Sequence, residues 1–174
     1  MESRLHLPNE HAPQKVRACY VDFDGVLHDD AVYWGIKRGI HIRTPGRVLF
    51  EWMPILEDLL APHPDIKIVL STSWVRVKSF EFAKKQLAPA LQERVIGSTY
   101  HRRHMRIDAF ELMSRGHQIL RDVERRKPVS WFAIDNDDFG WPDEYRDRLI
   151  RTEDHLGLSD RKVQDAIRNI LETL

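Results

Sequence analysis

The 174 residues include 27 Lys and Arg and 27 Asp and Glu, so the chain has no formal net charge at pH 7 and lacks the cationic field that stable nonspecific duplex binding needs. Its single cysteine, Cys19, excludes an internal disulfide framework and a cysteine-rich zinc site, and suits a reducing compartment such as the cytoplasm. The polar N-terminus has no signal-peptide core, and no apolar stretch approaches the roughly 18 residues of a membrane span.

Short apolar runs alternate with segments of helical periodicity along most of the chain. Residues 1–14 are polar and contain two prolines, which predicts a flexible arm before a single domain over 15–174. The expected strands are 16–21, 66–70, 94–98, 129–134 and 148–151, and the expected helices are 53–61, 77–91, 114–126 and 160–173. This alternation predicts a three-layer α/β/α sandwich around a central parallel sheet.

The segment between the first strand and the first helix contains the turn pair Pro45-Gly46. Strand-like residues 40–42 and 47–50 flank this pair, which predicts a small hairpin. The hairpin and the first helix use most of the residues available before the second strand. The sequence therefore leaves room for a minimal cap domain or none.

Three of the predicted strands end in polar residues. The first is followed by Asp22-Phe23-Asp24-Gly25, the second by Ser71-Thr72-Ser73, and a later one by Asp135-Asn136-Asp137-Asp138. In open parallel sheets, ligands bind at the carboxyl ends of the strands, so these side chains are expected to converge. Clustered carboxylates favour a hard cation such as Mg²⁺. Together with a hydroxyl and a basic residue, they suit phosphoryl transfer.

The motifs YVDFDGVL, IVLS and FAIDNDD follow one another in this order over about residues 16–140. In order and spacing they resemble the haloacid dehalogenase-like (HAD) superfamily of phosphohydrolases. The runs IKIVLSTSW and RVIGST are most similar to small bacterial HAD-like proteins, including domains fused to RNA-repair enzymes. The resemblance implies a Rossmann-like core and a Mg²⁺-dependent phosphatase that forms an aspartyl-phosphate intermediate.

The resemblance also implies roles for individual residues. Asp22 corresponds to the nucleophile, and Asp24 to the acid/base that protonates the leaving group and then activates water. Asp22, the backbone carbonyl of Asp24, and Asp135 would bind Mg²⁺. Ser71 would hydrogen-bond the phosphoryl oxygens.

Two assignments in this set stay open. Thr72 or Ser73 could take the phosphate-binding role if the strand ends later than expected. The second acid of the last motif is Asp137 or Asp138, and Asp138 is the one assigned here to the metal.

The basic residue of the third motif departs from the superfamily pattern. A lysine usually begins the helix before the last acidic strand, whereas Arg115 occupies that place here; Lys84, Lys85 and Lys127 are less well placed. Arginine keeps the charge and can grip a phosphoryl group with two donors, but the two residues are not interchangeable. The alternative function is therefore a catalytically weak or inactive binding or regulatory module.

Further features bear on the substrate. His101 and His104 lack an HExxH motif or a cysteine partner, so zinc is not expected, and the basic run over 101–106 is either a solvated loop or a guide for a phosphorylated polymer. Trp34, Trp74 and Trp141 follow the polar strand ends and could pack in the core or stack on a base. By analogy, an open site favours bulky substrates such as nucleic-acid ends or phosphoproteins, although a small phosphate ester is also possible. The sequence carries no signal for an oligomeric state.

Overall fold

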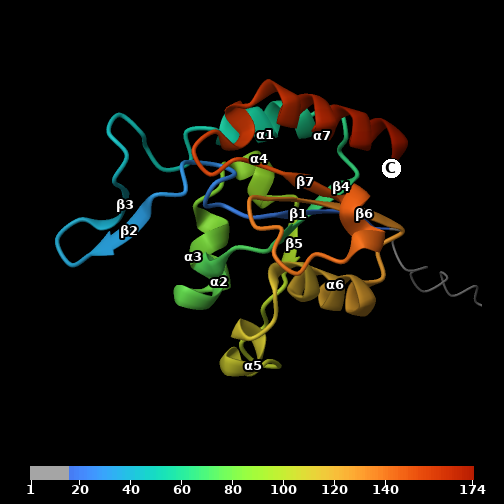
Figure 1. Ribbon diagram of the computed structural model, residues 1–174, viewed down its shortest axis with the longest axis horizontal. Helices are drawn as coiled ribbons and strands as arrows, with labels where there is room; N and C mark the ends of the chain where they lie inside the picture. The colour runs from blue at the N-terminus through green and yellow to red at the C-terminus, as the bar shows by residue number, and fades with distance from the viewer. Residues whose placement is uncertain (1–15) are drawn as a thin grey trace, which may run out of the picture.

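A five-stranded parallel sheet forms the centre of the computed structural model, which describes residues 16–174 (Figure 1). The expected arm over 1–14 lies outside the described residues. The strand order is β5-β4-β1-β6-β7, and the strands span β1 Arg17–Val21, β4 Ile66–Leu70, β5 Val95–Ser98, β6 Ser130–Asp135 and β7 Leu149–Arg151. Val21 pairs with both Leu70 and Ile134, so the three central strands end at the same level.

Helices cover both faces of the sheet (Figure 1). Helices α1 (Met53–Leu60), α4 (Pro89–Gln92) and α7 (Arg161–Thr173) lie on one face, and α6 (Arg115–Arg126) lies on the other. Shorter helices are α2 (Ser73–Val77), α3 (Phe80–Lys85), α5 (Ile107–Glu111) and the 3-10 turns η1 (Asp143–Arg148) and η2 (Gly157–Ser159). The predicted three-layer α/β class is confirmed. Within residues 16–174, no helix is long and apolar enough to cross a bilayer.

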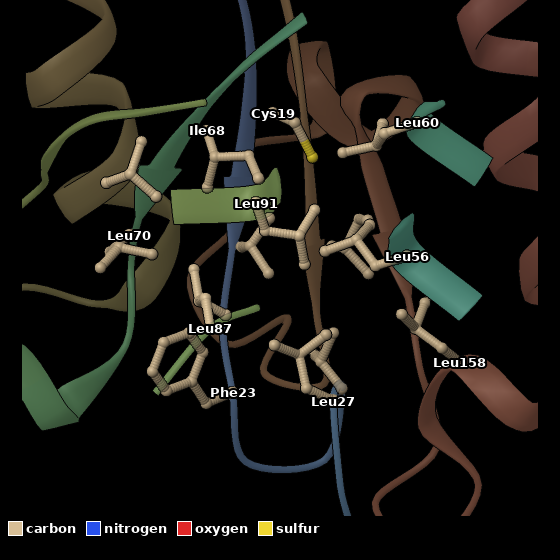
Figure 2. Packing of buried hydrophobic residues seen from close by; sticks show 14 of the residues in the cluster. Cys19, Phe23, Leu27, Leu56, Leu60, Ile68, Leu70, Leu87, Leu91 and Leu158 are labelled. Atoms are coloured by element: carbon tan, nitrogen blue, oxygen red, sulfur yellow. The ribbon is translucent and has the colours of Figure 1, made fainter. Parts of the chain in front are cut away.

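Alternation along the strands divides the core into two layers. On one face, Cys19, Ile68 and Leu70 belong to one cluster with Leu56 and Leu60 of α1, and Figure 2 shows Cys19 beside Leu60. On the other face, the neighbouring strand residues Ala18, Tyr20, Val69, Trp131 and Ala133 pack against Ile119 of α6. Both faces of the sheet are therefore buried, which explains why its strands are continuous apolar runs.

The hairpin after β1 is real, but its predicted position is wrong. Its strands are β2 (Val32–Gly35) and β3 (Gly39–Ile42), joined by a turn at 36–38 instead of at Pro45-Gly46. Gly39 has φ of +63°, a backbone conformation that glycine adopts at little cost. The β-branched and aromatic residues before the turn pair with those after it, whereas residues 47–50 form no strand.

The predicted helix over 77–91 is also wrong, because this segment forms parts of three short helices. Helix α2 ends at Val77, and Ser79 caps α3 by accepting a hydrogen bond from Phe82 N at 3.0 Å. Pro89 then begins α4, where its missing N–H would have no helical partner in any case. Apolar residues with near-helical spacing thus face the core from separate short helices.

Helix α6 carries a buried acidic residue, Asp122, that ties it to the sheet. Its carboxylate accepts hydrogen bonds from Tyr20 Oη at 2.9 Å and Arg126 Nε at 2.8 Å, and it also pairs with Arg125. Burial alone would raise the pKa of Asp122, but these donors hold it below its usual value. The stabilisation is therefore present above the unfolded-state pKa of about 4 and is lost as the pH falls through the lower folded-state pKa.

Replacing Asp122 with Asn is expected to lower the free energy of unfolding by about 2–3 kcal/mol at pH 7. The substitution removes the negative charge that compensates two arginines while keeping the side-chain shape. Urea unfolding at pH 7 and pH 3 measures the effect, which should shrink at the lower pH. Asp165→Asn, on the exposed side of α7, is the matched control. An equal loss at both pH values would contradict the ionic explanation.

Candidate active site

The polar strand ends converge at the carboxyl edge of the sheet. Strand β1 lies between β4 and β6, so Asp22 stands between Ser71 and Asp135. Backbone hydrogen bonds continue the ladder at this point: Asp22 N donates to Ile134 O at 3.2 Å, and Ser71 N donates to Val21 O at 3.0 Å. The order of the strands also changes direction beside β1: the chain adds β4 and β5 on one side of β1 and then β6 and β7 on the other. Ligands bind at such switch points of parallel sheets.

Arg115, the first residue of α6, contacts all three strand ends. Its Nη2 lies 3.1 Å from Asp22 Oδ2, and its Nε lies 3.1 Å from Asp135 Oδ2. Its Nη1 donates to the carbonyl oxygen of Ser71. The guanidinium thus occupies the position where the sequence pattern would place a lysine ammonium, and it bridges two carboxylates that would otherwise repel each other.

Burial dominates the electrostatics of the two bridged carboxylates. It raises the pKa of Asp22, opposed by the charge of Arg115, and the neighbouring Asp24 raises it further. Burial and the charge of Asp22 raise the pKa of Asp135 well above its usual value. Burial by itself would lower the pKa of Arg115, but the surrounding carboxylates raise it. Arg115 therefore stays charged, and the cluster favours a further positive charge.

The turn after β1 brings Asp24 back toward the same edge. Val26 N and Leu27 N both donate to Phe23 O, at 3.1 and 2.8 Å, which closes a tight turn. Gly25 has φ of +71°, and a Cβ there would lie 2.5 Å from Asn136 Nδ2. The glycine of the Asp-x-Asp-Gly motif is therefore needed both for the backbone conformation and for the close approach of the β6 loop.

Asp24 is held through one of its two carboxylate oxygens. Its Oδ1 accepts hydrogen bonds from Trp74 Nε1 and from His28 Nε2, each at 2.9 Å. His28 Nδ1 accepts from Phe50 N at 3.2 Å, so the ring proton is assigned to Nε2. Within residues 16–174 no donor contacts Asp24 Oδ2. The second oxygen is therefore available to carry a proton to or from a ligand.

An aromatic cluster fixes this arrangement. Phe50 packs edge-on against Phe23, His28 and Trp74, with ring centroids 5.2, 4.7 and 5.4 Å apart. Phe50 has φ of +60°, an uncommon conformation for a large side chain, and its N–H is directed at His28. Sequence reasoning missed His28 as a partner of Asp24. Its position four residues after Asp24 was the available signal, but the contact depends on the turn and on the distant Phe50.

Asp137 and Asp138, the two candidates for the second acid of the last motif, lie in different surroundings. Asp137 N donates to Asp135 Oδ1 at 3.0 Å, and Asp137 lines the same cavity of about 320 Å³ as Arg115 and Thr72. Asp138 instead lies near Arg146 and Arg151, at 3.5 and 3.6 Å. The structure thus brings Asp137 to the site and places Asp138 in a surface ion-pair group, and the choice of the second acid stays a prediction.

Of the remaining predicted residues, the two hydroxyl residues lie at the site, whereas the tryptophans and lysines named below lie elsewhere. Ser71 Oγ is buried and has no hydrogen-bond partner in the part of the chain that the structure describes, and Thr72 Oγ1 accepts from Trp74 N at 3.4 Å as the cap of α2. Both lie at the edge of the site. Trp141 packs in the core beside α6, whereas Trp34 is 62% exposed on the hairpin. Lys127 ends α6 at the opposite terminus from Arg115, and Lys84 and Lys85 lie on α3.

The donor atoms suit a hard cation. Asp135 Oδ2 is buried and forms no hydrogen bond within residues 16–174, although Arg115 Nε lies 3.1 Å from it, and the other nearby groups are carboxylate and carbonyl oxygens. Among residues 16–174, no three His, Cys, Asp or Glu side chains are already arranged to hold a metal ion. Two carboxylates, Asp22 and Asp135, do lie together, and Arg115 contacts both. The residues present therefore fit Mg²⁺ with backbone or solvent oxygens completing its shell.

A parallel α/β sheet with acids after β1 and β6, a hydroxyl after β4 and only a hairpin inserted after β1 defines a HAD-like domain with a minimal cap. Comparison with protein-family models matches residues 18–163 to the HAD domain in Swiss Army Knife RNA repair proteins. The chain belongs to this family. No curated protein and no solved structure matches it significantly.

Proposed function

We propose that this chain is a Mg²⁺-dependent phosphatase that hydrolyses a phosphomonoester through an aspartyl-phosphate intermediate. The observation that carries the proposal is the contact of Arg115 with Asp22, Asp135 and Ser71 at the ends of three adjacent strands. This contact supports the proposal because it brings a carboxylate proposed as the nucleophile, a cation and the backbone of the residue that carries the hydroxyl to one edge of the sheet. Membership of a family of HAD domains supports the same chemistry.

In the first step, a carboxylate oxygen of Asp22 attacks phosphorus and the bond to the leaving oxygen breaks. Oδ1 of Asp22 accepts the N–H of Phe23 at 2.7 Å, and Oδ2 accepts from Arg115 Nη2 at 3.1 Å. Oδ2 is the proposed attacking atom, because the Arg115 guanidinium that it faces is also proposed to bind the phosphoryl group. Arg115 and the unpartnered Ser71 hydroxyl bind the phosphoryl oxygens. Asp24 Oδ2 gives its proton to the leaving oxygen.

In the second step, Asp24 is a carboxylate and accepts a proton from water. The resulting hydroxide attacks phosphorus, the bond to Asp22 breaks, and inorganic phosphate leaves. Asp24 thereby regains its proton and Asp22 its carboxylate. The donors Trp74 and His28 hold the same Asp24 oxygen throughout, which keeps Oδ2 pointing at the reacting atoms.

Asp22, Asp135 and the backbone carbonyl of Asp24 are the groups proposed to hold Mg²⁺, with Asp137 as the nearby second acid. When bound, the ion neutralises charge on the phosphoryl oxygens. Because burial raises the pKa of both Asp22 and Asp135, a cation beside them also favours their ionised forms.

The family to which the chain belongs directs the choice of substrate. RNA repair requires the processing of phosphorylated strand ends, and a site with a minimal cap admits a polymer. We therefore include the ends of nucleic acids first among the substrates, ahead of phosphoproteins and small phosphate esters. We propose the cytoplasm as its compartment, because the chain has a single cysteine, Cys19, which is free and buried in β1.

One observation favours a second function, a binding module without turnover. Arg115 replaces the usual lysine and forms ion pairs with both carboxylates that the metal would need. The deciding experiment measures hydrolysis of p-nitrophenyl phosphate and of 5′- and 3′-phosphorylated oligonucleotides, with Mg²⁺ and with EDTA. Turnover that needs Mg²⁺ supports the phosphatase, and its absence on every ester supports the binding module.

The substitution Trp74→Phe tests the role of the donors to Asp24. It removes one N–H that holds Oδ1 but keeps an aromatic ring beside Phe23 and Phe50. We expect kcat to fall about tenfold with alkyl phosphates and much less with p-nitrophenyl phosphate, whose leaving group needs little protonation. Phe82→Leu, which alters the ring stacked on Trp74 without touching Asp24, is the control. An unchanged kcat with alkyl phosphates, or an equal fall in Phe82→Leu, would contradict the positioning role.

A further inference from the structure

We propose that the pocket between the β2–β3 hairpin and α2 binds the terminal nucleobase of a single-stranded nucleic acid while its end phosphate lies at Asp22. This proposal rests on the proposed phosphatase function and identifies the leaving group as the terminal nucleotide of a strand. The hairpin extends away from the sheet on the side of α2 and α3 (Figure 1). The pocket that it forms with α2 has a volume of about 330 Å³.

The position of the pocket relates it to the chemistry. Asp24 forms part of its wall, and the other lining groups come from the hairpin and from α2. Because Asp24 is proposed to protonate the leaving oxygen, the group attached to that oxygen must lie on the Asp24 side of the phosphoryl group. The pocket is therefore where the alcohol half of the substrate enters.

The lining of the pocket suits a flat aromatic ring. It is mostly apolar and is contributed by Val32, Tyr33, Trp34, Ile40, Trp74 and Val77. Trp34 is 62% exposed although its hairpin partner Ile40 is partly buried against the core. The guanidinium of Arg43 lies 3.6 Å from the ring centre of Tyr33, so that ring already has a partner. Trp34 is more exposed than Tyr33, and Lys78 Nζ lies farther from its ring centre, at 5.6 Å, so Trp34 is the more available stacking surface. Stacking on tryptophan suits every base.

Charge selects a nucleic acid over other aromatic phosphate esters. Lys78 lies at the rim, with Nζ 5.6 Å from the Trp34 ring centre. The same lysine lines a second, larger groove of about 770 Å³, whose basic residues are Arg76, Lys78, His101, Arg102, Arg103 and His104. Arg102 and Arg103 are exposed and form no ion pair within residues 16–174.

An aromatic platform followed by a series of cations is the arrangement that binds a base and then the phosphates of the following nucleotides. A phosphotyrosine ring would fill the pocket but would have no use for the basic groove beyond Lys78. This local charge also explains how a chain with no net charge could bind a polyanion. We therefore assign the basic run of residues 101–104 to the strand that continues beyond the terminal nucleotide.

The test compares kcat/KM for terminally phosphorylated oligonucleotides that have either a base or an abasic residue at the phosphorylated end. Trp34→Ala is expected to lower kcat/KM for the base-bearing strand roughly 10- to 100-fold and to abolish the advantage over the abasic strand. Ile36→Ala is the matched control, because Ile36 is 91% exposed at the tip of the same hairpin and does not line the pocket. It should keep the wild-type ratio.

Three results would overturn the proposal. One is a wild-type enzyme that hydrolyses base-bearing and abasic ends equally well, and another is equal loss on both strands in Trp34→Ala. The third is higher kcat/KM for a phosphotyrosine peptide than for any oligonucleotide, which would assign the pocket to a protein substrate. In each case hydrolysis itself continues, so the proposed phosphatase function survives.

A binding measurement covers the case in which no ester is hydrolysed and the phosphatase proposal fails. Fluorescence anisotropy of a labelled, terminally phosphorylated single strand gives Kd for the wild type, Trp34→Ala and Ile36→Ala. The pocket assignment predicts a Kd raised roughly tenfold or more by Trp34→Ala alone. Equal Kd values for all three proteins would overturn it.

Discussion

Replacing Asp22 with Asn is expected to lower the turnover of every phosphate ester by more than about 10⁴-fold, because an amide cannot form the phosphoryl-enzyme bond. The charge of Arg115 and the Ser71 hydroxyl remain, so substrate binding is largely kept. Release of inorganic phosphate from a phosphorylated oligonucleotide in Mg²⁺ measures the effect. Retention of even one hundredth of the wild-type rate would show that Asp22 is not the nucleophile.

Thermal unfolding provides the control for this variant. Asp22 is a buried carboxylate whose pKa is raised by burial, so a neutral isostere removes a charge that the interior disfavours. The unfolding temperature of Asp22→Asn is therefore expected to equal or exceed that of the wild type. A large fall in unfolding temperature would mean that lost activity reports lost structure.

Removing the guanidinium of Arg115 is expected to have the second largest effect. Arg115→Met should lower kcat/KM by about 10²–10³-fold, the usual effect of losing one strong donor to a phosphoryl-type oxygen. It should also lower the free energy of unfolding by about 3–5 kcal/mol, since Asp22 and Asp135 are left buried without their cation. Phosphatase assays and urea unfolding measure the two effects separately.

Arg115→Lys separates the charge of this residue from its shape. An ammonium restores the usual charge of the third motif but can no longer contact Asp22, Asp135 and the Ser71 carbonyl together. We expect activity within about tenfold of the wild type, as the pattern of the superfamily would suggest, and most of the stability. Higher Mg²⁺-dependent activity in Arg115→Lys would indicate that the arginine restrains a weak enzyme. Unchanged activity in Arg115→Met would exclude a phosphate-binding role.

Magnesium itself should stabilise the folded chain. Because Asp22 and Asp135 are buried together, an ion that binds them favours the folded state by an amount set by its concentration relative to Kd. The unfolding temperature should therefore rise with Mg²⁺ in the wild type and rise less in Asp135→Asn. Asp138→Asn is the matched control, because Asp138 pairs with surface arginines instead. A larger loss of the Mg²⁺ effect in Asp138→Asn would support Asp138 as the metal ligand.

The central sheet could be predicted because its strands are buried on both faces. Continuous apolar runs ending in acids or hydroxyls, such as those before Asp22 and Ser71, identify both a strand and its carboxyl end. The same logic fails for residues 77–91, where short helices with separate caps present apolar residues at nearly helical spacing. It also fails for the hairpin, where the pairing of β2 with β3 outweighs the Pro45-Gly46 signal.

The residues of the candidate site also divide into those that the sequence predicted and those that it did not. Residues adjacent to strand ends could be predicted from the chain, including Asp22, Asp24, Ser71 and Asp135. The side chains that position them could not, because their contacts come from distant parts of the fold. His28 acquires its role through Phe50 N, and Asp137 is distinguished from Asp138 only by the course of the β6 loop.

The central claim is that Asp22 is phosphorylated and that Asp24 is needed to release the phosphate. In Asp24→Asn, p-nitrophenyl phosphate should still react, since its leaving group needs no acid, but water can no longer be activated. A burst of p-nitrophenol equal to the amount of protein is expected, and borohydride reduction of the trapped acyl phosphate should convert Asp22 to homoserine, which peptide mapping locates. Steady turnover without a burst, or a phosphoryl group on any other residue, would contradict this claim.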